Sequence, residues 1–283
     1  MTRGRAERTC RSWRPGVRRL LLATAAAPFA LTATLEQARA LPIGGQVTTG
    51  AATLLQSGSS LTVDQSTQDA AIIWRGFSVA ANETVRFNQP NAGSITLNRV
   101  IGQNPSLILG RLSANGQVFI LNPNGVLFGQ GAQVNVGGLV ASTLEMTDAD
   151  FMAGRYALSG VAASAVVNQG AITAAPGGYV ALVGPRVTNT GAISAPQGGV
   201  GLAAGDRVTL TLSDGGLVGL NIDQATLNAL VRNRDVVQAP GGQVILTAEA
   251  MDQITRSVVN NSGVIEAGQS PTAAASYGWK AGT

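Results

Sequence analysis

The sequence predicts an all-β fold, a parallel β-helix in which each repeat forms one coil. Three observations lead to this prediction: an unusual composition, short aliphatic runs between turn residues, and segments that recur at a fixed period. The chain of 283 residues has 36 Gly, no His and only 4% aromatic residues. That composition is too apolar for a disordered chain and too rich in small residues for a helical bundle.

Short runs rich in Val, Ile, Leu and Thr recur from residue 41 onwards. Clusters of Gly, Asn and Pro separate them, and this punctuation is typical of many short strands. The clearest runs are 46–49, 71–74, 94–97, 107–109 and 117–121.

An internal repeat makes the prediction more specific. Segment 166–180 reads VVNQGAITAAPGGYV, and segment 187–200 reads VTNTGAISAPQGGV. The period is 21, because Asn168, Gly170 and Gly177 recur as Asn189, Gly191 and Gly198. Related pieces return at 240–246 and 258–267, beyond a longer insertion. In a parallel β-helix, equivalent strands stack about 4.8 Å apart, so their inward aliphatic side chains share one core.

Two other architectures share parts of this pattern. A β-sandwich also has many short strands and turns, and would make the internal similarity accidental. Leucine-rich repeats have a similar period, but their ladder of leucines is missing here. The parallel β-helix therefore remains the favoured fold.

Few segments favour other local structure. Residues 223–234 are the best helix candidate, because Asp223 can cap the start and three apolar residues fall on one face. Residues 249–257 are a weaker one. Residues 145–150 are expected to form a solvated loop, and the glycines of 199–205 are expected in turns, because their spacing does not fit a dinucleotide-binding loop.

The N-terminus has the three parts of a signal peptide. A polybasic start precedes the apolar run 20–31, and Ala38-Arg39-Ala40 supplies small residues at the spacing of a cleavage site. Pro28 and Glu36 interrupt the apolar run well before the ~20 residues that a membrane-spanning helix needs. The expected organisation is therefore a signal peptide at 1–40, a β-helix domain at 41–268 and a C-terminal tail at 269–283, in a truncated or a short exoprotein.

The charge distribution argues against nucleic-acid binding. Eight of the 19 basic residues and two of the 15 acidic ones lie within the first 40 residues, so the rest carries a net charge of −2. A phosphate-binding face needs clustered Lys or Arg on the folded part.

The residue types also limit the possible chemistry. The sole cysteine, Cys10, lies in the expected signal peptide, so the mature chain would hold neither thiol nor histidine. Cysteine metal sites, thiol catalysis and the Ser-His-Asp triad are excluded. We expect no cofactor, no metal site and no enzymatic activity.

The segment 115–129 reads NGQVFILNPNGVLFG and contains the most specific motif. Within it, residues 122–125 have the Asn, Pro and Gly positions of a type I turn, between two apolar runs. The whole segment resembles the signature of the two-partner secretion domain of filamentous haemagglutinin-like exoproteins. Supporting similarity comes from 99–111 (RVIGQNPSLILGR) and 135–144 (NVGGLVASTL).

Within this family the chain looks most like the high-molecular-weight adhesin branch. Many members carry a second motif, NPNL, upstream, whereas the corresponding stretch 87–93 reads FNQPNAG. Contacts attributed to that second motif are therefore not carried over to this chain.

The resemblance implies a right-handed parallel β-helix with N-terminal capping and extra-helical β elements. It implies a cognate outer-membrane barrel transporter as partner, and secretion from a Gram-negative bacterium, or display on its surface, via the periplasm. It also implies an adhesin or haemagglutinin that contacts a host receptor or glycan. The candidate transporter-recognition residues are Asn115, Gly116, Asn122, Pro123, Asn124 and Gly125.

Two alternative functions remain from the sequence. Parallel β-helices include carbohydrate-active enzymes, which would need converging carboxylates such as Asp206, Asp214 and Asp223 near Arg186 or Arg207. Contact-dependent inhibition toxins begin with a secretion module of the same kind. Nothing in the residues identifies a receptor.

Overall fold

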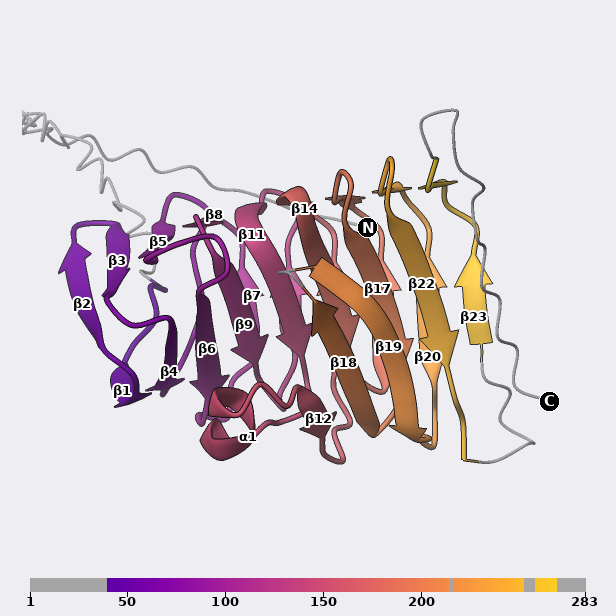
Figure 1. Ribbon diagram of the computed structural model, residues 1–283, viewed down its shortest axis with the longest axis horizontal. Coiled ribbons are helices and arrows are strands. Elements are labelled where there is room, and N and C mark those ends of the chain that lie inside the picture. Colours follow the sequence, from indigo (N-terminus) through magenta and orange to yellow (C-terminus); the bar gives the residue numbers. More distant parts are fainter. Residues whose placement is uncertain (1–39, 214–215, 252–257, 269–283) are drawn as a thin grey trace, which may run out of the picture. The chain divides into compact units, whose positions relative to one another are not determined.

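The computed structural model describes residues 40–213, 216–251 and 258–268, which form a stack of β-coils (Figure 1). The chain divides into the units Met1–Gln37 and Ala38–Thr283, and the second contains all of these coils. The expected signal peptide and C-terminal tail lie almost wholly outside the described residues.

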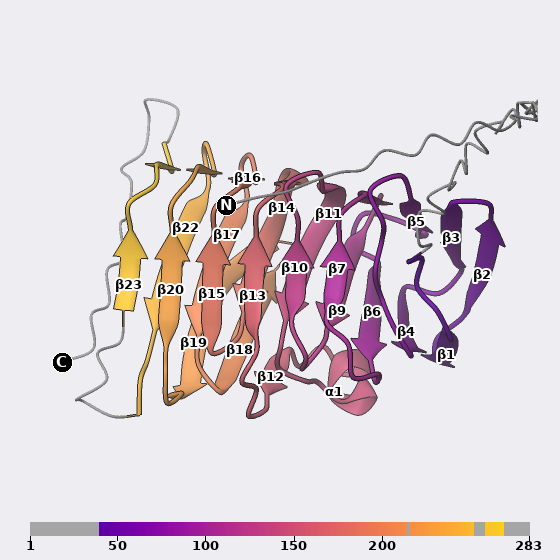
Figure 2. The ribbon, with the colours of Figure 1, turned by 180° about the vertical axis from the view of Figure 1, so that it is seen from behind.

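One face of the stack is a six-stranded parallel sheet, seen from its outer side in Figure 2. Its strands are β7 (Ser106–Ile108), β10 (Val126–Phe128), β13 (Ala165–Asn168), β15 (Arg186–Asn189), β20 (Leu230–Asn233) and β23 (Val258–Asn261).

Strands of a fifteen-stranded sheet cover the other faces. One row contains β3 (Ser60–Gln65), β5 (Thr84–Asn88), β8 (Arg111–Ala114), β16 (Ala192–Ser194), β21 (Val237–Gln238) and β24 (Ile265–Glu266). A second row contains β4 (Asp69–Trp74), β6 (Ile95–Val100), β9 (Gln117–Leu121), β17 (Gly199–Ala204) and β22 (Gln243–Ala248). The long strands β11 (Gln133–Ser142) and β14 (Ala171–Val183) run through both rows.

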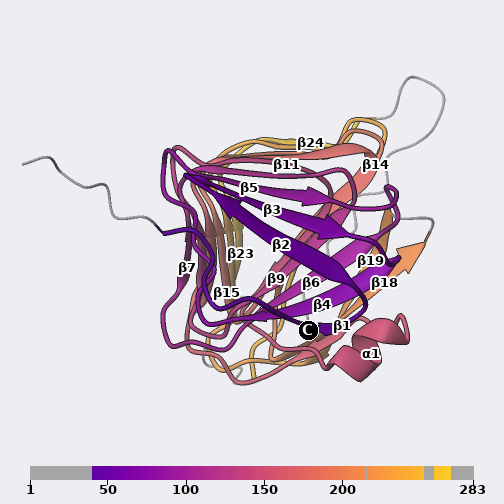
Figure 3. The same cartoon turned by 90° about the vertical axis from the view of Figure 1, so that its left-hand side faces the viewer.

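Every pairing between successive coils is parallel, which confirms the β-helix and rules out the β-sandwich. Figure 3, turned toward one end of the stack, shows equivalent strands lying behind one another. The antiparallel pairs lie at the N-terminal end of the stack and in a separate three-stranded sheet. Strand β1 (Gln46–Thr49) pairs with β4, and β2 (Ala52–Ser57) forms a hairpin with β3 at the N-terminal end.

The 21-residue period matches the observed stacking. Asn168 of β13 is the register partner of Asn189 of β15, and Ile172 is the partner of Ile193. At the next corner the period drops to 20, because Gly198 packs on Gly178 rather than on Gly177. A Cβ on Gly198 would lie 1.8 Å from the Gly178 carbonyl oxygen, so the coil spacing at this corner requires glycine.

Asparagine side chains form a buried ladder along the six-stranded sheet. Each amide nitrogen donates to the amide oxygen one coil further on: Asn168 to Asn189 at 2.8 Å, Asn189 to Asn233 at 2.7 Å, and Asn233 to Asn261 at 2.8 Å. Asn168, Asn189 and Asn233 are fully buried. The ladder satisfies polar groups that would otherwise be costly inside the fold.

The interior of the coils is one continuous hydrophobic core, in which most side chains are aliphatic. Alternate residues of each strand point inward, as the period of two requires. Buried examples from successive coils of one row are Val63, Val85, Leu112, Val134 and Ile172.

A second core lies outside the coils, against the row of β6, β9, β11, β14 and β17. It is covered by the short helix α1 (Asp148–Met152) and an antiparallel sheet of β12 (Ala157–Ser159), β18 (Arg207–Ser213) and β19 (Gly216–Gln224) (Figure 1). Phe119 of β9, for example, meets Phe151 of α1 with ring centroids 6.2 Å apart.

Tyr179 links three coils within the second core. Gln117, Gly138 and Tyr179 are register partners on β9, β11 and β14. A Cβ on Gly138 would lie 2.8 Å from the Tyr179 ring, so its absence lets the ring lie across β11. The Tyr179 hydroxyl then donates to Gln117 Oε1 at 2.6 Å, two strands away.

The predicted helix at 223–234 is wrong. Its first two residues end β19, and Leu230–Asn233 form β20 in the parallel sheet. Val231 and Asn233 point inward with the period of a strand, and Asn233 joins the asparagine ladder. Stacking on β15 outweighs the local helical pattern. Of the weaker helix candidate, residues 249–251 are not helical, and 252–257 lie outside the described residues.

Two smaller expectations also need correction. The stretch 145–150 is not only a solvated loop, since α1 begins at Asp148 and its Phe151 is buried. The glycines of 199–205 lie mainly in strand β17 rather than in turns. A Cβ on Gly201 would lie 2.1 Å from Leu220, so glycine here lets the outer sheet pack closely on the coil.

Within the described part of the chain, none of the helices is long and apolar enough to cross a membrane.

Replacing Asn233 with alanine tests the ladder. We expect the free energy of unfolding to fall by about 1–3 kcal/mol for each neighbouring amide left unpaired. Urea denaturation measures this change. Asn260→Ala is the matched control, because Asn260 is exposed one residue from the ladder, and its effect should stay within about 0.5 kcal/mol. Equal losses in both variants would contradict the ladder.

Tyr179→Phe tests the hydroxyl that spans β11. Burial raises the pKa of the Tyr179 phenol well above its ordinary value. A raised folded-state pKa stabilises the fold below the unfolded pKa of about 10, and this contribution is lost as pH rises toward the folded value. The variant should lose about 1–3 kcal/mol at neutral pH, because Gln117 Oε1 loses its donor. Its stability should then decline less steeply above pH ~10 than that of the unaltered chain. Denaturant midpoints of both chains, measured across a pH series, test this prediction. The same dependence of stability on pH in both chains would refute it.

Candidate functional site

Residues 122–125 form the predicted turn between β9 and β10. The Gly125 N–H donates to the Asn122 carbonyl at 2.9 Å, which closes the turn. Asn122 Oδ1 accepts from the Asn124 N–H at 3.0 Å. Gly125 has φ +116°, a conformation that other residues rarely adopt.

The two asparagine side chains of this turn fasten it to the preceding coil. Asn122 is fully buried, and its Nδ2 donates to the Asn104 carbonyl and to Ser106 Oγ, both at 3.0 Å. Asn124 Nδ2 donates to the Gly102 carbonyl at 2.8 Å. The Asn122 N–H reaches the Ser142 carbonyl of the following coil at 2.9 Å. The turn therefore joins three consecutive coils.

Asn115 and Gly116 make a similar junction at the other end of β9. Asn115 pairs with the Gln89 backbone in both directions: its Nδ2 donates to the carbonyl, and its Oδ1 accepts from the N–H, each at 2.7 Å. The Gly116 N–H donates to Gln89 Oε1 at 3.0 Å. A Cβ on Gly116 would lie 2.6 Å from the Ser94 carbonyl oxygen, so only glycine fits.

Gln89 is a structural residue of this junction that the sequence did not single out. It lies in the stretch 87–93, which departs from the family's second motif, and it is 7% exposed. Its Nε2 donates to the carbonyls of Ser94 and Gln117 and to Thr96 Oγ1, at 2.9–3.1 Å. In the sequence, the Asn-Gln-Pro-Asn run of residues 88–91, which contains Gln89, is the signal for this position.

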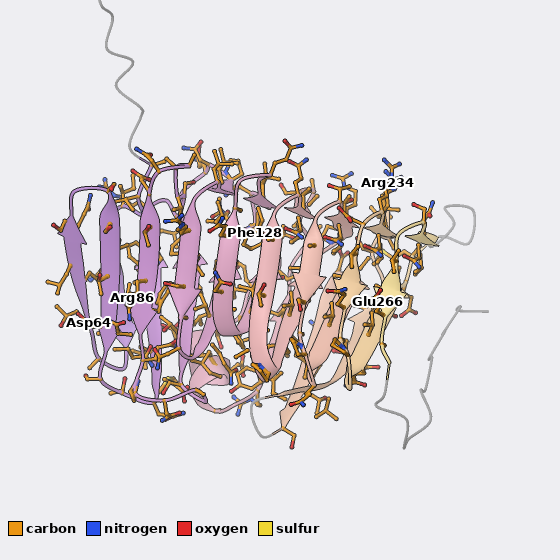
Figure 4. All side chains as sticks on the ribbon, turned by 90° about the horizontal axis from the view of Figure 1, so that it is seen from above. Asp64, Arg86, Phe128, Arg234 and Glu266 are labelled. Carbon is orange, nitrogen blue, oxygen red and sulfur yellow. The ribbon has the colours of Figure 1, made fainter. Side chains whose placement is uncertain are left out.

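The accessible surface beside these junctions is a shallow groove of about 520 Å³ over β5 and β8. Exposed Arg86 lies here, and its Nε donates to Asn88 Oδ1 at 2.8 Å. Asn88 Nδ2 donates in turn to Asp64 Oδ1 at 2.6 Å. Figure 4 labels Asp64 and Arg86 on the neighbouring strands β3 and β5. Asn115 lines this groove and is exposed, whereas Asn122 is fully buried. Its lining residues are Arg86, Phe87, Asn88, Gln89, Ser113, Ala114 and Asn115.

Among residues 40–213, 216–251 and 258–268, no group of three or more acidic side chains is placed to hold a metal ion. Asp148 pairs with Arg99 at 2.8 Å and accepts from the Thr48 hydroxyl at 2.7 Å. Asp150 pairs with Arg155 at 2.7 Å, and hydrogen bonds from Thr147 and then Arg155 lower the pKa of Asp150.

The acids proposed for an enzymatic groove have separate environments. Asp223 accepts from the Thr209 hydroxyl and from Asn221 Nδ2, each at 2.5 Å. Asp206 is buried in the turn after β17, and Asp214 lies outside the described residues. The Asp206 N–H donates to the carbonyl of Gln224, next to Asp223, at 2.9 Å, but no hydrogen bond joins the two described carboxylates to a shared partner. The geometry therefore gives no support to a carbohydrate-active enzyme.

Curated relatives match less than half of the chain. A heme/hemopexin-binding protein of Haemophilus influenzae is 46% identical over 114 residues, which is 40% of this chain and 13% of that protein. A second H. influenzae protein of the same description is 45% identical over 86 residues, 30% of this chain and 9% of that protein. The matches thus span a small fraction of those relatives' lengths.

A solved structure matches the fold over most of the chain. The HMW1 secretion domain of H. influenzae superposes with a TM-score of 0.68 at 30% sequence identity, covering 81% of this chain and 65% of that one. This agrees with the resemblance to the high-molecular-weight adhesin branch.

The family itself is shown by a profile that covers most of the sequence. The TPS secretion domain profile matches residues 38–279, which include every described coil and all six candidate recognition residues. Such domains belong to exoproteins that Gram-negative bacteria secrete across the outer membrane with a cognate transporter. This chain belongs to the TPS secretion domain family, and it is the exoprotein module that the transporter recognises in two-partner secretion.

Proposed function

We propose that the transporter recognises and binds residues 122–125, together with Asn115 and Gly116, while the chain is still unfolded. The observation that carries this proposal is the complete burial of Asn122 in the folded coil. A partner can contact that side chain only before the coil closes. After export, the same amides bind Asn104, Ser106 and Gly102.

The proposed route starts with cleavage after Ala40 and continues through the periplasm to the transporter. Outside the cell, each coil would template the next, because a solenoid coil contacts mainly its neighbours. Burial of each new coil would then bias transport outward without a nucleotide.

We propose an adhesin or haemagglutinin as the exoprotein that carries this module, with a host receptor or glycan as its target. The support is the similarity to the HMW1 secretion domain and the family resemblance. The toxin alternative uses the same module, and no contact among the described residues favours it.

Secretion of the Asn122→Ala/Asn124→Ala double variant tests transporter recognition. The chain is co-expressed with and without its transporter, and the protein in the medium is measured. We expect at least a ~10-fold loss, as a deficit of about 1.4 kcal/mol in transporter binding would produce. Purified variant, refolded in vitro, must still give the β-rich circular dichroism spectrum of the parent chain.

Asn233→Ala is the matched control for lost stability. It also removes a fully buried asparagine that bonds to neighbouring coils, but it lies outside the motif. Its secretion should stay close to that of the unaltered chain. If the two variants lose secretion in proportion to their lost stability, residues 122–125 are a structural corner and the recognition proposal is wrong.

A further inference from the structure

Glu83 is a buried carboxylate with an unusual set of partners. It is 1% exposed, and its Oε2 accepts from the Ala80 N–H at 2.8 Å. Its two oxygens share the Ala40 N–H at 3.0 and 3.1 Å. Unlike Asp148 and Asp150, it has no cationic side chain within 4.0 Å among the residues that the structure describes. A buried charge without a counter-ion is costly.

The backbone around Glu83 is firmly held. The Glu83 N–H donates to the Ala80 carbonyl at 2.9 Å, and the Glu83 carbonyl accepts from the Arg111 N–H at 3.0 Å. A Cβ on Gly110 would lie 2.1 Å from the Ala80 carbonyl oxygen, so the next coil packs directly on this turn. The carboxylate therefore cannot reach solvent without opening the first coils.

The chain segment that meets Glu83 is the expected start of the mature protein. Leu41 directly follows Ala40, and its side chain is 4% exposed within the interior core. Among the described residues, no acceptor pairs with the Leu41 N–H. Consecutive Cα atoms lie about 3.8 Å apart, so the Leu41 nitrogen lies about one residue spacing from the Ala40 nitrogen that Glu83 binds.

We propose that the α-ammonium of Leu41 becomes the ion-pair partner of Glu83 once the signal peptide is removed. This inference rests on the proposed cleavage after Ala40. A signal peptidase and one water molecule break the Ala40–Leu41 amide bond. Ala40 leaves with the new carboxylate, and Leu41 keeps the new amine, which is protonated near neutral pH.

Processing would then couple directly to folding. The precursor offers Glu83 only the neutral Ala40 amide, whereas the mature chain would offer a full positive charge on the next residue, Leu41. An ion pair between hydrogen-bonded charges is stronger than a bond from a neutral donor. The N-terminal coils therefore close more stably after cleavage than before it, which keeps the unprocessed chain easier to unfold.

The stabilities of four chains are compared to test whether cleavage strengthens folding through Glu83. These chains begin at Leu41 or at Ala38, each with Glu83 or with Glu83→Gln, and all end at Thr283. With Glu83 present, we expect the chain that begins at Leu41 to have a smaller unfolding equilibrium constant than the chain that begins at Ala38. Glu83→Gln should reduce the ratio of these two constants at least ~10-fold, which corresponds to about 1.4 kcal/mol. Glu145→Gln, at an exposed glutamate, is the matched control and should leave the difference intact. An unchanged difference in the Glu83→Gln pair overturns the proposal.

A second measurement does not depend on the Glu83 variant folding. The chains with Glu83 are treated with an amine-acylating reagent, folded and in denaturant, and N-terminal labelling is followed by mass spectrometry. The amine of the chain that begins at Leu41 should react at least ~10-fold more slowly when folded, since an ion-paired ammonium is not nucleophilic. The chain that begins at Ala38 should show little protection. Equal labelling of both folded chains also overturns the proposal.

N-terminal sequencing of the secreted protein separates the two hypotheses. A mature N-terminus other than Leu41 would refute the proposed cleavage site, and with it the role of the ion pair in natural processing. The recombinant chains would still show whether Glu83 binds a Leu41 ammonium.

Discussion

In-register stacking of successive coils is the constraint on which the rest of this structure depends. Each strand pairs in parallel with its equivalents above and below, so a residue type suited to one coil is suited to the next. This is why inward aliphatic residues form one core and why asparagines at equivalent positions form a ladder. Only side chains that match the spacing of the coils fit the corners, as the glycine contacts show.

Amide side chains do much to fix the register in which successive coils stack. Asn115, Asn122 and Asn124 bind the backbone of the preceding coil. The buried Gln89 side chain bonds to Thr96 of β6 and to Gln117 of β9. A buried amide must be satisfied, so each of these residues fixes the register of its coil. The family motif is therefore also a set of contacts between coils. Under the proposed mechanism, one group of residues serves recognition in the unfolded chain and register in the folded one.

The structure also shows how insertions are accommodated without breaking the stack. The segments that form α1, β12, β18 and β19 leave the coils and cover an outward apolar row. Arg99 and Thr48 hold Asp148 of α1, so residues from three distant parts of the chain meet there. This covering explains why Gly201, which carries no side chain, lies beneath Leu220 of β19.

The sequence by itself determined the fold class, the 21-residue period and the closed turn at 122–125, because these features are repeated or local. It also predicted β-strands at 46–49 and 117–121 with their observed bounds. Only the tertiary structure decided that residues 230–233 form a strand rather than a helix, because the ladder partners that decide it come from other coils. The same holds for Tyr179 with Gln117 and for Glu83 with Ala40, which are separated by 62 and 43 residues. Such contacts depend on which coils become neighbours, and no local pattern encodes that adjacency.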